Sequence, residues 1–364
     1  MNAVSRVPEY IRTLVAYAPG KPIEEVEREY GIANSVKLAS NENPLGPSPK
    51  ALTALREKAD QLHLYPDGDC FYLKSALAKR LAIDADSLIF GNGSNELIEL
   101  AVRTFMRPGD EAVMARQAFV VYQLVVQAAG GVSKVVPLRN FTHDLPAMAA
   151  AIGPKTRIVF LANPNNPTGT IYRRSEWQSF LSELSPDVLV IVDEAYFEYV
   201  PDPEYPDSLQ YRYQGKALLT LRTFSKLYGL AGLRIGYGIG RKEIVGLLHR
   251  VRQPFNVNAA AQWAALAALE DHEHVRQSLE LNREGMQYLT NQIASLGLEQ
   301  VPSQANFLLV RVGNGNEVFE RLLRQGVIVR PMAVYEFPDY VRVTVGTMEE
   351  NRKFIEALKK VVRG

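Results

Sequence analysis

Residues 217–239, "ALLTLRTFSKLYGLAGLRIGYGI", indicate the fold class. A β-rich apolar run at 217–221 leads into a polar turn that carries Lys226, and a second apolar run follows at 235–239. The same alternation of apolar run, polar or glycine-rich turn and helix-compatible segment recurs from about residue 85 to 240. It is typical of a mostly parallel sheet covered by helices, so we predict an α/β fold. The predicted strands are 88–90, 112–115, 157–162, 188–192, 217–221 and 235–239.

The pattern changes after Pro254. Two helices are expected there, the first rich in alanine, and three β-rich runs follow, "NFLLVRV", "GVIVRP" and "YVRVTVG". These features predict a separate, smaller α+β domain. We expect an N-terminal arm and part of the small domain at 1–45, a large domain at 46–265 and the small C-terminal domain at 266–364.

Composition excludes several functional classes. The chain has 364 residues, 47% of them hydrophobic, and its 41 basic and 40 acidic residues leave a net charge of +1. No overall field therefore attracts nucleic acid or membranes, and no signal peptide or apolar run of membrane-spanning length is recognisable. We expect a cytoplasmic protein. Its single cysteine, Cys70, can form no internal disulfide and has no cysteine partner for a metal site, so no metal is predicted.

In open α/β sheets, ligands bind beyond the carboxyl ends of the strands. Strand 88–90 runs into "GNGSNELIEL", where Gly91 and Gly93 allow a tight turn and the amides of Ser94 and Asn95 can face an anion. A glycine turn before a helix is also common as a plain connection. This segment alone is therefore a weak indication of an anion site.

Two further strands end in polar residues. Strand 157–162 runs into "NPNNPTG", whose turn can hold an asparagine amide in a fixed direction, although a plain surface turn is equally compatible. Strand 188–192 is followed at once by Asp193. A carboxylate at that depth requires a cationic or proton-donating partner, unless it only caps the next segment.

Strand 217–221 leads to Thr223, Ser225 and Lys226, with Arg234 eight residues later. Hydroxyls and an arginine suit a phosphate, and a desolvated lysine loses its proton readily and can attack a carbonyl. Most lysines are solvated surface charges, but here an anion site, a buried carboxylate and the lysine meet at one sheet edge. A ligand that needs all three is pyridoxal 5′-phosphate (PLP).

Motifs along nearly the whole chain support this cofactor. In order they are "SNENPLGPSP", "YPDG", "NPNNPTG", "VDEAYFEY", "RTFSKLYGLAGLRIGYG", "RQPFNVN" and "VRVTVG". With them the chain resembles the fold-type I PLP-dependent aminotransferases, and within them the histidinol-phosphate branch. The resemblance implies a mostly parallel seven-stranded sheet between helices, a smaller α+β domain and a homodimer with shared active sites.

The resemblance also implies catalytic roles. Lys226 would form a Schiff base with the cofactor and move a proton during transamination, and Asp193 would keep the ring nitrogen protonated. Asn166 and Tyr196 would hydrogen-bond the ring hydroxyl group. The cofactor phosphate would be held by Ser94, Asn95, Thr223, Ser225, Arg234 and, from the other subunit, Tyr65.

Two assignments are less direct. The family stacks an aromatic residue on the cofactor ring, and in "RQAFVVY" the candidate is Phe119, although the usual Pro-Thr before it is missing and a core phenylalanine is nearly as compatible. For the substrate anion the resemblance implies Arg342, with Arg330, Tyr17 and Asn43 as further substrate-binding residues. Strand alternation alone would put Arg342 on a solvent face, and a guanidinium suits phosphate and carboxylate alike.

The expected reaction is transamination of L-histidinol phosphate with 2-oxoglutarate, giving 3-(imidazol-4-yl)-2-oxopropyl phosphate and L-glutamate in histidine biosynthesis. The alternative is an aromatic amino-acid (Phe/Tyr) aminotransferase. Tyr335, Glu336 and Phe337 stand where a glycine-containing turn is expected and could reshape the pocket. A decarboxylase on the same scaffold would release carbon dioxide, and a PLP-sensing regulator would need a DNA-binding module for which the chain has no room.

Overall fold

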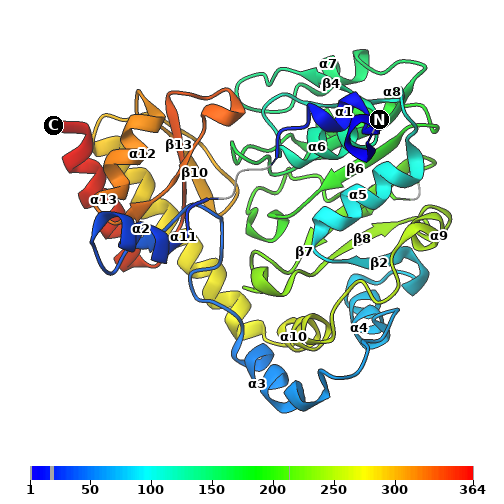
Figure 1. Cartoon of the computed structure of the whole chain (residues 1–364), viewed down its shortest axis with the longest axis horizontal. Helices are drawn as coiled ribbons and strands as arrows, with labels where there is room; N and C mark the ends of the chain where they lie inside the picture. The colour runs from blue at the N-terminus through cyan, green and yellow to red at the C-terminus, as the bar shows by residue number, and fades with distance from the viewer. Residues whose placement is uncertain (1, 17–19, 213, 364) are drawn as a thin grey trace.

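The computed structural model describes residues 2–16, 20–212 and 214–363. Figure 1 shows a larger unit built on one broad sheet and a smaller unit beside it that contains β10, β13 and the C-terminal helix. Helix α11 (His272–Ser295) runs from the junction of the two units into the smaller one. The domain boundaries at residues 45 and 265 stay a prediction.

The larger unit contains a seven-stranded sheet, which confirms the α/β prediction. The order is β2-β8-β7-β6-β5-β3-β4, and every neighbouring pair is parallel except those that involve β8. The strands are β2 (Leu88–Gly91), β3 (Glu111–Ala115), β4 (Val132–Val136), β5 (Thr156–Ala162), β6 (Leu189–Asp193), β7 (Ala217–Thr223) and β8 (Gly236–Gly240).

Strand β4 was not predicted. It lies at the sheet edge, where Val132 is exposed and Lys134 pairs with Glu111 of β3 at 2.8 Å. An edge strand often carries charge and lacks the continuous apolar pattern of strands covered on both faces. The other strands are apolar runs and were predicted.

Helices cover both faces of this sheet because its buried strands are apolar on both sides. Along β5, Ile158 and Phe160 pack with one helix layer, and Val159 and Leu161 pack with the other. The first layer contains α5 (Ser94–Phe105), α6 (Val121–Ala128) and α9 (Lys242–Val251). The second contains α4 (Phe71–Leu81), α7 (Leu145–Ala150), α8 (Arg174–Glu183) and α10 (Ala259–Leu269). Helix α3 (Pro49–Lys58) packs on α10.

The smaller unit contains an antiparallel sheet of order β12-β13-β10-β9. Its strands are β9 (Gln300–Val301), β10 (Phe307–Arg311), β12 (Arg330–Pro331) and β13 (Tyr340–Thr344). They share a core with α11, α12 (Gly315–Leu323) and α13 (Met348–Arg363). The short helices α1 (Glu9–Arg12) and α2 (Ile23–Tyr30) belong to the N-terminal arm.

The run "GVIVRP", predicted as one strand, forms two. Its first part, β11 (Val327–Ile328), pairs in parallel with β1 (Val36–Lys37), whereas β12 pairs with β13. The N-terminal arm thus contributes a strand to the smaller unit. A partner this distant in sequence leaves no signal in the local pattern, which is why the division was not predicted.

A buried ion-pair network lies beside strand β7. Arg222, 2% exposed, donates through Nε and Nη2 to Glu194 at 2.9 and 2.8 Å, and through Nη2 to Asp207 at 2.8 Å. Its guanidinium carbon lies 3.5 Å from the centre of the Phe197 ring. Glu194 is fully buried, and its charge is stabilised by Arg222 and by the Ser208 amide, which donates to Oε1 at 3.0 Å.

We predict that Arg222→Leu lowers the free energy of unfolding by about 3–5 kcal/mol, because it leaves the buried Glu194 charge without its cationic partner. Urea unfolding followed by circular dichroism measures this loss. The matched control is Arg276→Leu, which breaks exposed pairs with Glu273 and Glu280 on α11 and should leave the unfolding curve nearly unchanged. Equal effects of the two substitutions would contradict the prediction.

Candidate active site

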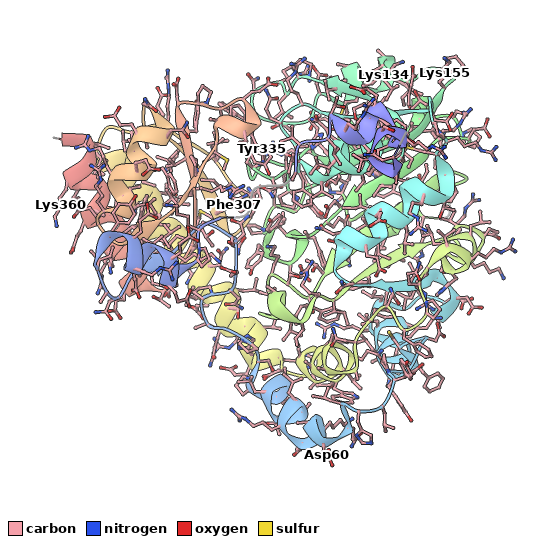
Figure 2. All side chains as sticks on the ribbon, in the orientation of Figure 1. Asp60, Lys134, Lys155, Phe307, Tyr335 and Lys360 are labelled. Carbon is pink, nitrogen blue, oxygen red and sulfur yellow. The ribbon has the colours of Figure 1, made fainter. Side chains whose placement is uncertain are left out.

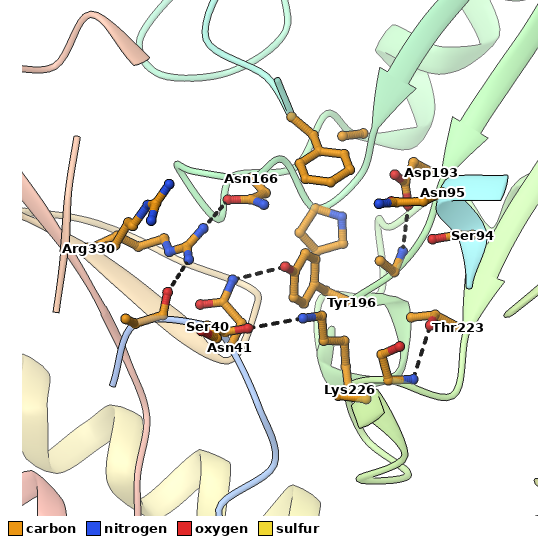
Figure 3. A pocket seen from close by; sticks show the side chains of 18 of the residues that line it. Ser40, Asn41, Ser94, Asn95, Asn166, Asp193, Tyr196, Thr223, Lys226 and Arg330 are labelled. Atoms are coloured by element: carbon orange, nitrogen blue, oxygen red, sulfur yellow. Dashed lines mark hydrogen bonds between the residues drawn. The ribbon is translucent and has the colours of Figure 1, made fainter. Parts of the chain in front are cut away.

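A cavity of about 240 Å³ lies at the carboxyl ends of β5, β6 and β7, where the smaller unit faces the sheet (Figure 3). A single water needs only roughly 10–15 Å³, so the cavity has room for a small organic ligand. The predicted site residues that line it are Ser94, Asn95, Phe119, Asn166, Asp193, Tyr196, Thr223, Ser225, Lys226, Arg234, Arg330 and Arg342.

Lys226 follows β7 in a turn that its neighbours stabilise. The Ser225 amide donates to Thr223 Oγ1 at 3.0 Å, and Lys226 Nζ donates to the carbonyl of Ser40 at 3.2 Å. Desolvation lowers the pKa of the Lys226 amine to about 8, and the positive charge of Arg342 contributes in the same direction. Lys226 is therefore unprotonated in a much larger fraction of molecules than an ordinary lysine.

Asp193 is the last residue of β6 and is 7% exposed. Its Oδ2 accepts a hydrogen bond from the Tyr122 hydroxyl at 2.7 Å, and its Oδ1 accepts from the Ala195 amide at 3.2 Å. Burial raises the pKa of the Asp193 carboxyl, and these two donors oppose that shift. The carboxylate thus has the donor partners that its depth requires, and a cationic ligand group would stabilise it further.

An anion cradle forms where β2 leads into α5. Gly93 has φ +76°, and a Cβ there would lie 2.5 Å from Nη2 of Arg234. A Cβ on Gly236 would lie 2.5 Å from the amide nitrogen of Ser94. The two glycines therefore let the Arg234 guanidinium and strand β8 approach the amino end of α5, where amides and helix dipole favour a phosphate.

Tyr196 and Asn166 line the wall between Lys226 and the smaller unit (Figure 3). Burial raises the pKa of the Tyr196 phenol to about 12, so the phenol keeps its proton as a donor. Asn166 Oδ1 accepts a hydrogen bond from Arg342, which leaves its amide hydrogens as the donors that it can offer a ligand. Phe119 lines the same cavity and packs edge-on against Tyr122, with ring centres 5.7 Å apart.

The smaller unit contributes two arginines, Arg330 of β12 and Arg342 of β13, which pair with each other in the sheet. Arg342 is 6% exposed and donates to the carbonyl of Ala39 at 2.7 Å. Its guanidinium carbon lies 5.2 Å from the centre of the Phe307 ring. Strand alternation alone suggested a solvent face for Arg342, which is wrong because this face of β13 lies against the cavity and the 39–41 segment.

The segment 333–337 also contributes to the cavity. Tyr335 lines it and is 7% exposed, and Figure 2 shows Tyr335 and Phe307 at the junction of the two units. Glu336 has φ +60°, the left-handed conformation for which a glycine is expected, and its carboxylate lies 3.6 Å from Arg116 of the larger unit. Phe337 packs with Phe141 and Tyr340. The segment therefore joins the two units beside the cavity.

Two predicted residues in the described part of the chain do not line the cavity. Asn43 is buried and donates to the carbonyl of Leu227 at 2.7 Å and to Ser278 Oγ at 2.9 Å, so its contacts in this chain are structural. Tyr65 is 84% exposed and stacks on Phe255 with ring centres 5.0 Å apart. Tyr17 lies outside the described residues.

Tyr122 and Asn41 were not predicted as site residues, and Tyr335 was predicted to shape the pocket but was given no site role. Phe119 lies just before α6 and Tyr122 lies in its first turn, so the local pattern did not show that both side chains face the cavity. Asn41 and Tyr335 belong to segments far from the sheet in sequence. Only the folded chain brings them to Tyr196 and the two arginines.

Comparisons with known proteins agree with this geometry. The family model described as Aminotransferase class I and II matches residues 33–358. The chain is 52% identical to the histidinol-phosphate aminotransferase of Moorella thermoacetica, covering 99% of this chain and 94% of the relative. It is 50% identical to histidinol-phosphate aminotransferase 2 of Nitrosospira multiformis, covering 98% of this chain and 92% of the relative.

Solved structures share the fold. The histidinol-phosphate aminotransferase of Sinorhizobium meliloti, crystallised in complex with pyridoxal-5′-phosphate, superposes with a TM-score of 0.91 at 28% identity over 99% of this chain and 98% of that chain. An aspartate aminotransferase mutant from Thermus thermophilus superposes with a TM-score of 0.83 at 25% identity over 98% of this chain and 99% of that chain. The same architecture thus occurs in proteins named for different substrates.

We predict that Gly93→Ala weakens binding of PLP, the expected cofactor, by tenfold or more, because the added Cβ meets the Arg234 guanidinium and strains a positive φ. Titration of the apoprotein with PLP, followed by cofactor absorbance, measures the change. The control is Gly232→Ala, where the structure has no atom within 4 Å of the new Cβ. An unchanged PLP affinity in Gly93→Ala would show that the cradle does not bind the cofactor.

Proposed function

The chain belongs to the class I and II aminotransferases, and from this premise we propose that it transfers the amino group of L-histidinol phosphate to 2-oxoglutarate with PLP as cofactor. The products are 3-(imidazol-4-yl)-2-oxopropyl phosphate and L-glutamate, in histidine biosynthesis. One observation carries the proposal. A lysine amine of lowered pKa lies in a cavity with a buried carboxylate, an anion cradle on one side and two arginines on the other.

The residues fit PLP in size and chemistry. The cradle suits the cofactor phosphate, Asp193 suits the protonated ring nitrogen, and Asn166 and Tyr196 suit the ring oxygen. When bound, PLP supplies an aldehyde that captures amines and a ring that withdraws electrons from the substrate carbon. The proposed phosphate ligands are Ser94, Asn95, Thr223, Ser225 and Arg234, and Phe119 is the proposed stacking residue.

Lys226 is proposed to capture the cofactor aldehyde and then to carry a proton. With a pKa of about 8, Nζ is unprotonated in about a tenth of molecules at pH 7, whereas an ordinary lysine is unprotonated in well under a thousandth. The unprotonated amine can accept the proton that leaves the amine-bearing carbon of the substrate. Asp193, held by Tyr122 and Ala195, would keep the facing ring nitrogen positively charged through this step.

Arg330 and Arg342 are proposed to bind the substrate phosphate. Both line the end of the cavity opposite the cradle, and a guanidinium offers paired donors to phosphate oxygens. Tyr17 remains a proposed substrate-binding residue, whereas Asn43 is proposed to act indirectly, by donating to the Leu227 carbonyl beside Lys226. Aromatic amino-acid transamination is the alternative, because Phe119, Tyr122, Tyr196 and Tyr335 give the cavity aromatic walls.

We also propose an active homodimer. Tyr65 faces solvent in one chain, so it could reach a cofactor phosphate only in a second copy. Large apolar or aromatic side chains near it in sequence are also exposed, namely Leu62, Leu64, Phe71 and Tyr72, and Leu64 and Tyr72 line one surface hollow with Tyr65. An exposed apolar group of this kind is typical of a protein interface.

A cytoplasmic location is part of the same proposal. No helix among residues 2–16, 20–212 and 214–363 is long and apolar enough to cross a membrane. The single cysteine, Cys70, is buried, so the fold uses no internal disulfide, which suits a reducing compartment.

We predict that L-histidinol phosphate converts the bound cofactor to its amine form much faster than L-phenylalanine does, because its phosphate offers Arg330 and Arg342 more negative charge and more oxygen acceptors than a carboxylate does. Stopped-flow absorbance of the PLP-loaded protein, without 2-oxoglutarate, measures each half-reaction. Equal or faster conversion by phenylalanine would favour the aromatic alternative.

Arg342→Ala distinguishes the two substrates further. We expect a loss of at least tenfold in kcat/KM for histidinol phosphate and a smaller loss for L-histidinol, which lacks the phosphate. Equal losses would argue against phosphate recognition by Arg342. Lys226→Ala is the negative control and should retain PLP through the cradle while losing turnover.

The shared site can be tested by mixing subunits. We predict that Tyr65→Ala and Lys226→Ala proteins, each nearly inactive, regain up to about a quarter of wild-type activity after joint refolding, since half of the dimers are mixed and each holds one intact site. Activity assays with analytical ultracentrifugation measure this recovery. A dimer without recovery would show that Tyr65 does not act across the interface.

A further inference from the structure

The segment 38–43 crosses between the two units, and Asn41 is its most constrained residue. Asn41 is 1% exposed and has φ +55°, in the left-handed region. Its carbonyl accepts a hydrogen bond from Asn306 Nδ2 at 3.2 Å, and the neighbouring Leu38 carbonyl accepts from the Thr344 amide at 2.8 Å. The smaller unit therefore holds the backbone of this segment in place.

The hydrogen bonds around Thr344 determine which way the Asn41 amide faces. The Asn41 backbone N–H donates to Thr344 Oγ1 at 2.9 Å, and Thr344 Oγ1 donates to Asn41 Oδ1 at 3.0 Å. With Oδ1 engaged by this hydroxyl, Nδ2 is the atom that faces Tyr196, and it donates to the phenol oxygen at 2.9 Å (Figure 3). The reversed amide would present two donors to Thr344 and leave the threonine hydrogen without this acceptor.

The direction of this bond has a consequence for Tyr196. Because the phenol oxygen accepts from Asn41, its own hydrogen is not used by Asn41 and can be donated to another acceptor. Tyr196 lines the cavity, and its ring packs edge-on against Phe307 with centres 5.2 Å apart, which restricts its rotation. A ligand atom in the cavity can therefore accept this hydrogen.

We infer that Asn41, oriented by Thr344, is a positioning residue that directs the Tyr196 hydroxyl hydrogen at the ring oxygen of the cofactor. This inference rests on the proposed function, in which Tyr196 faces that oxygen. Thr344 lies two residues after Arg342 on the same face of β13, and Arg342 donates to the carbonyl of Ala39 in the same segment. The strand that carries the proposed substrate arginine thus also orients the group that tunes the cofactor.

The test compares Thr344→Val with Thr344→Ser in the PLP-loaded protein. Valine keeps the shape but removes the hydroxyl, so the Asn41 amide can reverse and take the phenol hydrogen, whereas serine keeps the hydroxyl. A cofactor ring oxygen without its phenol donor holds the neighbouring proton more tightly. We therefore expect the midpoint of the pH-dependent cofactor absorbance to rise by about one pH unit, a tenfold change, in Thr344→Val and to stay at the wild-type value in Thr344→Ser.

Two further variants make the result decisive. Asn41→Asp keeps size and tolerates the left-handed backbone, but its ionised carboxylate can only accept, so it should raise the midpoint in the same direction. Tyr196→Phe removes the phenol hydroxyl altogether and gives the largest shift of the midpoint to be expected. If circular dichroism shows that Thr344→Val does not fold, the midpoint of Asn41→Asp is compared with that of the wild type instead.

The outcomes separate the inference from the proposed function. A raised midpoint in Asn41→Asp and Thr344→Val, with rescue by serine, supports the inference. Wild-type midpoints in both variants, while Tyr196→Phe shifts, would overturn it and leave the aminotransferase proposal intact. A wild-type protein without PLP absorbance or amino transfer would overturn the proposed function itself.

Discussion

The removal of the Lys226 amine from water is the constraint on which the rest of the site depends. An amine in the open would be protonated at neutral pH, but desolvation and nearby positive charge lower its pKa to about 8. The surrounding wall therefore has to be dry, and the apolar sheet provides this because β6 and β7 are buried almost throughout. The lowered pKa of the Lys226 amine therefore depends on the burial of the sheet behind it.

The same desolvation acts on every charge near the cavity, so each charge has a partner. Asp193 takes hydrogen bonds from Tyr122 and Ala195, and behind the sheet Glu194 takes them from Arg222. These adjacent carboxylates have different roles. Glu194 is paired with Arg222 within the chain and stabilises the fold, whereas Asp193 accepts hydrogen bonds from the neutral donors Tyr122 and Ala195 and keeps the capacity to pair with a cationic ligand.

The second unit completes the site through one short segment of the N-terminal arm. Ser40, Asn41 and Ala39 contact Lys226, Tyr196 and Arg342 respectively, and Thr344 and Asn306 hold the segment from the other side. Groups that would meet the cofactor and groups that would meet the substrate thus share one structural support. A movement of the smaller unit would therefore displace the groups that face the cofactor and the groups that face the substrate.

The sequence by itself determined the α/β class, the buried strands and the polar residues at their ends, because apolar periodicity and the sudden change to Asp193 or Lys226 are local signals. It also identified the family through ordered motifs. Local patterns could not predict the edge strand β4, the division of 327–331 between two sheets or the burial of Arg342, since each depends on a distant partner. Only the tertiary structure decided that Tyr122 donates to Asp193 and that Asn41 donates to Tyr196, because hydrogen-bond direction follows from how the whole surrounding network is satisfied in space.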